Sequence, residues 1–389
     1  MDTITVIASN YPSPGREVNV FVQQLVHALI DQDIKVTVLA YQSVMHSLLH
    51  KVKLLPRHSL GVTDTGIEYD IYRPYTISFG NSNLLSGLTK WVNKKSITSL
   101  VNRINSDVLY CHFWTSALPV YKYALKNHIP LFVACGEGDN ALEDMVASMS
   151  KTELKDLTSA ITGVVSVSSE NKRKCIEYGL AKENEIEVFP NCVDTNLFKQ
   201  LDKSSCRSQL NISQDDFVIA FVGGFIPRKG PERVAQAIEC INDSSIKVMF
   251  IGKEFPGYPF EFDCSGIIHK GPVDHNKLPT YLNAADIFVL PTQKEGCCNA
   301  VVEALSVGLP IVSSNGAFND DILDNKNSIR IDPNDVNAIV KAIITLRDDK
   351  KRRSTMADYS HSRHDEYSIK NRARGILSFI NNQLVDFRK

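Results

Sequence analysis

A chain of 389 residues with 43% hydrophobic and 22% charged residues is long enough for two domains, each with its own core. Its 43 Lys and Arg residues nearly balance 44 Asp and Glu residues, so a net charge of -1 excludes a general attraction to nucleic acid. Nine cysteines without a C-x-x-C pair are typical of reduced thiols, and no signal peptide or membrane-spanning apolar run is evident. These features predict a cytoplasmic protein.

The first half of the chain alternates short apolar, β-branched runs with segments of helical periodicity. Apolar residues from Val18 to Leu29 recur at the spacing of a helix that lies on a sheet. The intervening runs are typical of buried parallel strands, so the pattern predicts repeated βαβ units. The predicted strands are residues 3–9, 35–40, 67–73, 107–111, 131–135 and 163–167.

A second series of the same kind begins near Asp194, and its predicted strands are residues 217–222, 247–251, 266–269, 287–290 and 310–313. The last segment has apolar residues at helical spacing and no strand after it. The sequence therefore predicts an α/β protein with two doubly wound, Rossmann-like domains, at residues 1–193 and 194–367. Residues 368–389 are expected to form a helix that packs back on the first domain.

The most informative motif follows the predicted strand 287–290 and leads into a helix near Asn299. Such a loop directs backbone N–H groups and the positive end of the helix dipole towards the sheet edge, a geometry that suits a diphosphate. Glu295 lies in the loop and Glu303 about one turn into the helix, where their carboxylates can bind sugar or ribose hydroxyls. The spacing alone also allows a helix-start charge at Glu295 and a solvated Glu303.

A second motif follows the predicted strand 217–222. Gly223 and Gly224 let a ligand approach the backbone, and Arg228 and Lys229 can neutralise the charge of a departing diphosphate. Taken alone, the Arg-Lys pair also fits a solvated turn.

Together with residues 188–194 and Phe198, these motifs resemble family 4 retaining glycosyltransferases of the GT-B fold, in the family's order and over nearly the whole chain. The resemblance implies two domains facing a cleft. The C-terminal domain would hold a nucleotide diphosphate sugar, and the N-terminal domain would hold a glycan or lipid-linked acceptor. It implies a transfer that needs neither an obligatory metal nor a cofactor, and it suggests a role in bacterial surface polysaccharide synthesis.

The resemblance also implies roles for individual residues. Glu295 would contact the donor sugar, Glu303 the ribose, and the Arg228-Lys229 pair the diphosphate. His112, after the predicted strand 107–111, matches the histidine that reaches the donor sugar from the N-terminal domain, although a strand-end histidine bonded to backbone is the plain alternative. The donor-binding set implied by the family is Gly15, Gly223, Gly224, Arg228, Lys229, Gly296, Cys297, Cys298, Asn299 and Glu303.

Three positions depart from the family pattern. Cys298 and Arg16 stand where the family usually has glycine, and residues 134–140 differ from its commonest pattern at the acceptor face. The acceptor is therefore poorly constrained by the sequence.

The resemblance implies a same-face transfer with retention, and no carboxylate is singled out as the nucleophile that a double displacement would need. A nucleotide-sugar epimerase or a phosphorylase-like enzyme of the same fold is the nearest alternative. A nicotinamide-dependent oxidoreductase is disfavoured, because the G-x-G-x-x-A match at residues 136–141 comes after several strands and contains acids that repel a pyrophosphate. The D-x-D match at residues 31–33 is interpreted as surface charge, so no metal site is predicted.

Basic residues outnumber acids between Tyr41 and Arg103. Two interpretations stay open: an amphipathic helix that packs on the sheet, or a surface that binds an anionic membrane and makes the enzyme peripheral. The basic residues are Lys51, Lys53, Arg57, Arg73, Lys90, Lys94, Lys95 and Arg103, and the apolar residues among them are Leu48, Leu49, Leu54, Leu55, Leu84, Leu85, Leu88, Trp91 and Val92.

Overall fold

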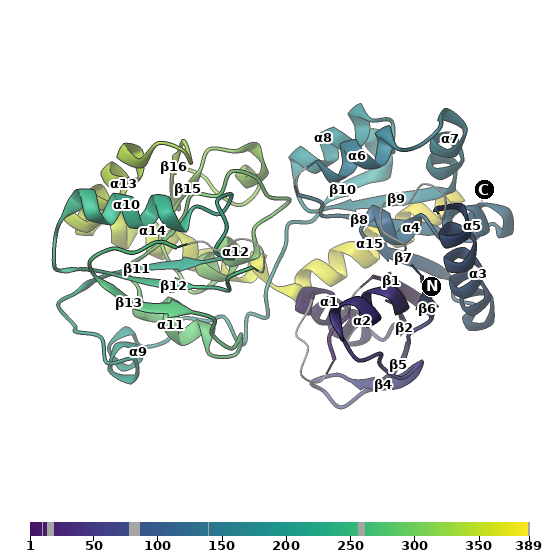
Figure 1. The fold of residues 1–389 in the computed structure, drawn as a ribbon, viewed down its shortest axis with the longest axis horizontal. Coiled ribbons are helices and arrows are strands. Elements are labelled where there is room, and N and C mark those ends of the chain that lie inside the picture. The colour runs from purple at the N-terminus through teal and green to yellow at the C-terminus, as the bar shows by residue number, and fades with distance from the viewer. Residues whose placement is uncertain (10, 14–18, 78–85, 139, 256–260, 388–389) are drawn as a thin grey trace. The chain divides into compact units, whose positions relative to one another are not determined.

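The computed structural model describes residues 1–9, 11–13, 19–77, 86–138, 140–255 and 261–387. The chain forms two compact units, the N-terminal unit of Met1–Phe189 with Arg372–Lys389 and the C-terminal unit of Pro190–Asn371 (Figure 1). Gly15, Arg16, Leu84 and Leu85, which the sequence analysis singled out, lie outside the described residues, as do the side chains of Leu88, Lys90 and Trp91.

The N-terminal unit is built on an eight-stranded sheet in which each strand pairs in parallel except the edge strand β4. β8, for example, is buried along its whole length, as expected for a strand covered on both faces. The sheet order is β10 (Ile186–Val188), β9 (Ile161–Ser166), β8 (Leu131–Cys135), β7 (Val108–His112), β1 (Thr3–Ala8), β2 (Lys35–Ala40), β5 (Glu68–Tyr72) and β4 (His58–Val62). The strand order reverses between β1 and β7, which is where open α/β sheets bind ligands at their carboxyl edge.

Helices connect these strands, and the short strands β3 (Gln42–Ser43) and β6 (Tyr75–Thr76) form a separate pair. The helices are α1 (Val20–Ile30), α2 (Val44–His50), α3 (Ser86–Ile104), α4 (Trp114–Ala117), α5 (Tyr121–Asn127), α6 (Ala141–Ala147), α7 (Lys151–Ala160) and α8 (Ser169–Glu177), with a 3-10 turn η1 (Glu183–Glu185). The final helix, α15 (Ile369–Phe387), belongs to the N-terminal unit from Arg372 onward. Its Phe379 ring contacts Phe132 and Phe189 of that unit.

The C-terminal unit has a six-stranded parallel sheet. Its order is β13 (Ile267–Gly271), β12 (Ile246–Ile251), β11 (Phe217–Val222), β14 (Ile287–Leu290), β15 (Ile311–Ser314) and β16 (Ser328–Ile331). The helices are α9 (Lys203–Gln209), α10 (Pro231–Ile241), α11 (Leu278–Ala284), α12 (Asn299–Ser306), α13 (Val336–Asp348) and α14 (Lys350–Ser362), with 3-10 turns η2 (Ala317–Asn319) and η3 (His364–Tyr367). Helices cover both faces of this sheet (Figure 1). Here the strand order reverses between β11 and β14.

The predicted α/β fold class is confirmed by these two parallel sheets. Four strands, β2, β8, β11 and β14, have the predicted bounds. The prediction that Arg73 contributes to a basic surface is wrong, because Arg73 is buried and donates a hydrogen bond of 2.6 Å to Ser59 Oγ.

Candidate functional site

The candidate site lies where the strand order of the C-terminal sheet reverses. β11 and β14 are adjacent and parallel, with Ile219 opposite Ile287, so their carboxyl ends meet at one edge of the sheet. The chain after β11 carries Gly223 to Lys229, and the chain after β14 carries Glu295 to Asn299. The two motifs predicted from the sequence are therefore neighbours, although about 70 residues separate them.

Backbone geometry fixes the loop after β11. A Cβ atom on Gly252 would lie 1.9 Å from the carbonyl oxygen of Gly223, so β12 can approach the loop only because residue 252 is glycine. Gly230 has φ of 78° and caps α10, whose first residue is Pro231. A left-handed residue followed by proline ends the loop sharply and starts the helix directly after Arg228 and Lys229.

Three donors converge on one carboxylate oxygen of Glu295. Lys229 Nζ lies 2.5 Å from Glu295 Oε1, Arg228 Nη1 lies 3.0 Å from it, and Thr292 Oγ1 donates at 2.7 Å. The guanidinium of Arg228 also donates to the carbonyl of Lys294. The side chain of Glu295 is 13% exposed and that of Lys229 is 16% exposed, so this is a largely desolvated cluster rather than a solvated turn.

The cluster keeps an excess of positive charge, because two cations face one carboxylate. Burial opposes the charge on Lys229, but the pKa of its ammonium is raised above the ordinary value, and the facing Glu295 carboxylate contributes to this rise. Burial raises the pKa of the Cys298 thiol, which keeps it neutral. One net positive charge beside a helix N-terminus favours an anionic ligand.

Helix α12 begins beside this cluster. Cys298 is its N-cap, and the buried Oδ1 atom of Asn299 has no hydrogen-bond partner in the part of the chain that the structure describes. Asn191, from the predicted 188–194 motif, donates its side-chain amide to the carbonyl of Cys297 at 2.9 Å. The 188–194 motif is therefore in direct contact with the loop that follows β14.

Glu303 is buried on the second turn of α12 and pairs with a residue that the sequence analysis missed. His275 Nε2 lies 3.1 Å from Glu303 Oε1, and the imidazole packs on Phe198 with ring centroids 5.1 Å apart. The role of Thr292 as a partner of Glu295 was also missed. A threonine three residues before Glu295 was readable as a possible partner, whereas nothing in the sequence links His275 to a carboxylate 28 residues away.

His112 belongs to the N-terminal unit, at the carboxyl end of β7. Its imidazole is buried against the rings of Phe21 and Phe113, at centroid distances of 5.2 and 4.5 Å. Neither ring nitrogen has a hydrogen-bond partner among the described residues, so the expected backbone-bonded alternative is not what the structure has. Burial, and secondarily the charge of Arg372, lower the pKa of His112 to about 3, so the ring is neutral near neutral pH.

Within the described ranges, no group of three or more His, Cys, Asp or Glu side chains is arranged to hold a metal ion. Among the same residues, no helix has the length and apolar character needed to span a bilayer.

Family models match both halves of the chain. The model described as Glycosyltransferase Family 4 matches residues 18–197, and the model described as Glycosyl transferases group 1 matches residues 202–363. The chain belongs to glycosyltransferase family 4. The family resemblance predicted from the motifs at Gly223 to Lys229 and at Glu295 to Glu303 is thereby confirmed.

Two curated bacterial relatives illustrate the family. The chain is 28% identical over 201 residues to the UDP-Gal:alpha-D-GlcNAc-diphosphoundecaprenol alpha-1,3-galactosyltransferase of Escherichia coli, covering 49% of this chain and 52% of the relative. It is 26% identical over 216 residues to the capsular polysaccharide biosynthesis glycosyltransferase CapM of Staphylococcus aureus, covering 52% of this chain and 56% of the relative. The chain thus spans about half the length of the curated relatives it matches.

Solved structures confirm the fold over the whole chain. The sucrose-phosphate synthase of Thermosynechococcus elongatus is similar with a TM-score of 0.79 and 16% identity, covering 99% of this chain and 100% of that one. This likeness identifies the fold as GT-B.

Proposed function

We propose that this family 4 glycosyltransferase transfers a hexose from a nucleoside diphosphate sugar to a glycan or lipid-linked acceptor, with retention of the anomeric configuration. The observation that carries the proposal is the cluster of Arg228 and Lys229 on Glu295 beside the first turn of α12. Its net positive charge and the helix dipole both suit a diphosphate. The donor would be a UDP-sugar, as the name of the Escherichia coli relative states for that enzyme.

Glu295 is better suited to holding a sugar hydroxyl than to attacking the anomeric carbon. Three donors on its Oε1 atom restrain the carboxylate and reduce its nucleophilicity, which disfavours a covalent intermediate. In a same-face transfer the bond between the donor phosphate oxygen and the anomeric carbon breaks, and the acceptor oxygen bonds to that carbon from the same face. The departing phosphate oxygen accepts the proton of the acceptor hydroxyl. Arg228 and Lys229 would then stabilise the charge that develops on the leaving diphosphate, without a metal ion or other cofactor.

Glu303 and His112 would have separate parts. Glu303, oriented by His275, would accept hydrogen bonds from the ribose diol of the donor. His112 would hydrogen-bond to the donor sugar as a neutral imidazole, because burial keeps it uncharged. Its unpartnered ring nitrogens leave it able to accept or donate such a bond.

The acceptor would be an intermediate of bacterial surface polysaccharide synthesis. The names of both relatives support this class, one through a diphosphoundecaprenol-linked sugar and the other through a capsular polysaccharide. A lipid-linked acceptor requires an enzyme that works at the membrane surface. We infer peripheral binding through the N-terminal unit, where Leu48 and Leu49 on α2 are 68% and 73% exposed and Lys94 and Lys95 on α3 are also exposed.

The test is a thermal-shift screen against nucleoside diphosphate sugars, followed by NMR of the product formed with the best donor and a lipid-linked acceptor. A donor that binds only the native state raises the melting temperature. The expected product has the anomeric configuration of the donor, and its formation survives EDTA. An inverted anomer would reject the mechanism, and an epimerised donor formed without acceptor would reject the transferase activity.

A further inference from the structure

The chain makes a strained turn directly after His112. Phe113 has φ of 70° and ψ of 153°, a conformation that residues other than glycine rarely adopt and that costs energy unless the surroundings hold it. Three hydrogen bonds hold it in this structure, and in one of them the Ser116 N–H donates to the Phe113 carbonyl at 3.1 Å. The Phe113 N–H donates to the carbonyl of Ala134 at 3.0 Å, and the Trp114 N–H donates to Glu137 Oε1 at 2.8 Å.

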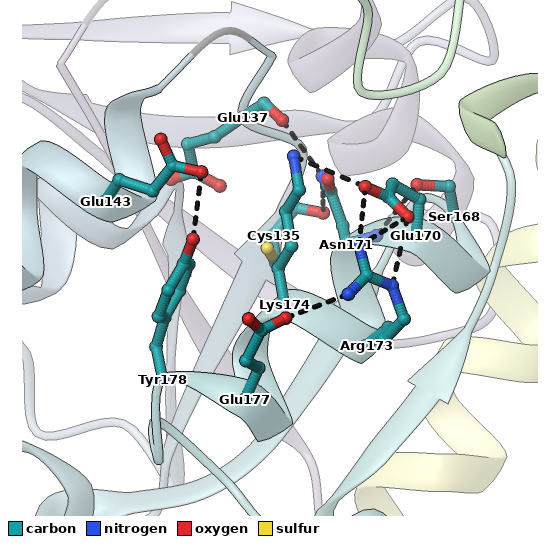
Figure 2. A network of polar contacts seen from close by, with 10 residues as sticks. All are labelled: Cys135, Glu137, Glu143, Ser168, Glu170, Asn171, Arg173, Lys174, Glu177 and Tyr178. Carbon is teal, nitrogen blue, oxygen red and sulfur yellow. Dashed lines mark hydrogen bonds and ion pairs between the residues drawn. The ribbon is translucent and has the colours of Figure 1, made fainter. Parts of the chain in front are cut away.

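Glu137 is itself fixed from the opposite side by α8. The side-chain amide of Asn171 donates to the backbone carbonyl of Glu137 at 3.0 Å, and the Asn171 N–H donates to Ser168 Oγ at 3.2 Å (Figure 2). The loop also lies close against the turn, since a Cβ atom on Gly136 would be 3.1 Å from the Phe113 ring. Contacts therefore run without a gap from α8 through Glu137 to the turn after β7.

The orientation of His112 depends on this turn. No described residue bonds to either ring nitrogen, so the imidazole is oriented by its backbone and by packing on Phe21 and Phe113. A change in the Phe113 conformation would move both the backbone of His112 and one of the two rings that contact it.

We propose that Glu137 is a positioning residue for His112. The Glu137 carboxylate holds the strained Phe113 turn by accepting a hydrogen bond from the Trp114 N–H. The proposal rests on the proposed function in one respect, because the catalytic importance of this position follows from the part assigned to His112. A carboxylate is an unexpected choice for packing alone. The Glu137 carboxyl is buried, and burial raises its pKa to about 7.

Two substitutions separate positioning from charge. Glu137→Gln keeps an oxygen acceptor for the Trp114 N–H, whereas Glu137→Ala removes it. We expect Glu137→Gln to retain kcat within about threefold and Glu137→Ala to lose at least about tenfold in kcat, with the KM for the donor changed less than about twofold. Glu143→Ala is the matched control, because Glu143 is a nearby carboxylate that accepts a hydrogen bond from the Tyr178 hydroxyl.

A readout independent of turnover tests the same contact. The sequence has only two tryptophans, so Trp91→Phe leaves Trp114 as the single tryptophan, whose emission can be excited selectively. The Trp114 emission and the NMR signals of the His112 imidazole should match those of the parent in Glu137→Gln and be altered in Glu137→Ala. If Glu137→Ala does not fold, Asn171→Ala replaces it, with an intermediate loss of kcat expected.

Wild-type kcat in Glu137→Ala, or equal loss in both Glu137 variants, would overturn the positioning role. An unchanged His112 signal in folded Glu137→Ala would overturn it as well. The parent enzyme could lack transferase activity while Glu137→Ala still alters the Trp114 emission and the His112 signals. That outcome would reject the proposed function but support the positioning of His112 by Glu137.

Discussion

Glu295 shows how a single carboxylate organises the cations around it. Arg228 comes from the loop after β11, Thr292 follows β14, and both bond to the same oxygen of Glu295. Because Lys229 also contacts that oxygen, the carboxylate fixes two cations in place before any ligand arrives. Groups oriented in advance stabilise developing charge without reorganising during the reaction.

Removing one of these cations should affect turnover more than folding. We expect Arg228→Ala to lower kcat at least about tenfold, which corresponds to about 1.4 kcal/mol of transition-state stabilisation, with a nearly unchanged melting temperature. Lys277→Ala is the control, since Lys277 forms an exposed ion pair with Asp274 in the same unit. Initial-rate kinetics with both variants decide the matter, and equal turnover in the two would remove Arg228 from the site.

Glu303 should act mainly through donor affinity. A ribose contact is the same in the ground state and the transition state, so Glu303→Ala is expected to raise the donor KM at least about fivefold with little change in kcat. His275→Ala should have a smaller effect in the same direction, because it removes the partner at 3.1 Å and leaves the carboxylate in place. A variant with reduced kcat and unchanged KM would contradict the ribose assignment.

Glu137 should make stability depend on pH. Burial raises its pKa from an ordinary value of 4.5 to about 7 in the folded chain, so the native state holds the proton more tightly than the unfolded state. The native advantage is present below about pH 4.5 and is lost as the pH rises through 7, by about 3 kcal/mol at most. Urea unfolding of wild type and Glu137→Gln should show this loss only in wild type. If the free energy of unfolding depends on pH in the same way in both proteins, the pKa of Glu137 is not raised in the folded chain.

The approach of β12 to the site loop depends on the absence of a side chain at Gly252. A Cβ atom on Gly252 would contact the Gly223 carbonyl oxygen at 1.9 Å, whereas one on Gly223 would find its nearest neighbour at 3.5 Å. The first distance requires the backbone to shift, and the second is ordinary van der Waals contact.

Gly252→Ala should therefore destabilise the C-terminal unit by about 1–3 kcal/mol, while Gly223→Ala should fold normally. Calorimetry of the two variants provides a matched comparison, because each adds one methyl group to the same pair of loops. Equal melting temperatures would mean that the backbone at Gly223 is free to relax.

Much of the sheet structure could be predicted from the sequence, because strands buried on both faces form continuous apolar runs, as in Lys35–Ala40 and Phe217–Val222. The edge strand β4 (His58–Val62) was missed because its residues alternate between exposed and half-buried, and β10 (Ile186–Val188) was missed because it has three residues. The strand ends that carry the site were predicted, but the partners of its side chains were not. The pairs of His275 with Glu303 and of Glu137 with Trp114 arise from tertiary packing, which leaves no mark in local spacing.

Helix α15, at the far end of the chain, completes the core of the N-terminal unit. Ile376, Phe379 and Ile380 are buried, and a Cβ atom on Gly163 would lie 3.1 Å from the Phe379 ring. A side chain buried in this way contributes about 1.5–3 kcal/mol. The two units have separate sheets, so their stabilities can be altered separately.

Deleting residues 372–389 should lower the melting temperature of the N-terminal unit and leave that of the C-terminal unit nearly unchanged. Deleting only residues 385–389 is the control, because Val385 and Phe387 are exposed. Calorimetry of the two truncations, with a nucleotide present to mark the C-terminal transition, distinguishes them. A single transition lowered equally in both would show that α15 does not stabilise one unit selectively.

The N-terminal unit carries exposed apolar and basic side chains of the kind that bind an anionic membrane surface. Leu48 and Leu49 are among the most exposed large apolar side chains described, and Lys94 and Lys95 add positive charge to the same unit. Apolar side chains that enter a bilayer surface, with cations contributing about 1 kcal/mol each, would bring the acceptor site to an anionic lipid substrate.

Vesicles containing phosphatidylglycerol should therefore sediment the protein at low salt and release it at high salt, because screening weakens the attraction of exposed charges. The double variant Lys94→Glu/Lys95→Glu should bind several-fold more weakly, whereas Lys350→Glu/Lys351→Glu, a matched charge reversal on exposed residues of α14, should bind like wild type. Leu48→Ser/Leu49→Ser should weaken binding at every salt concentration, since apolar insertion is not screened. Equal binding by the two lysine variants would mean that the attraction depends on net charge and not on Lys94 and Lys95. No binding even at low salt would mean that the exposed leucines do not contact a membrane.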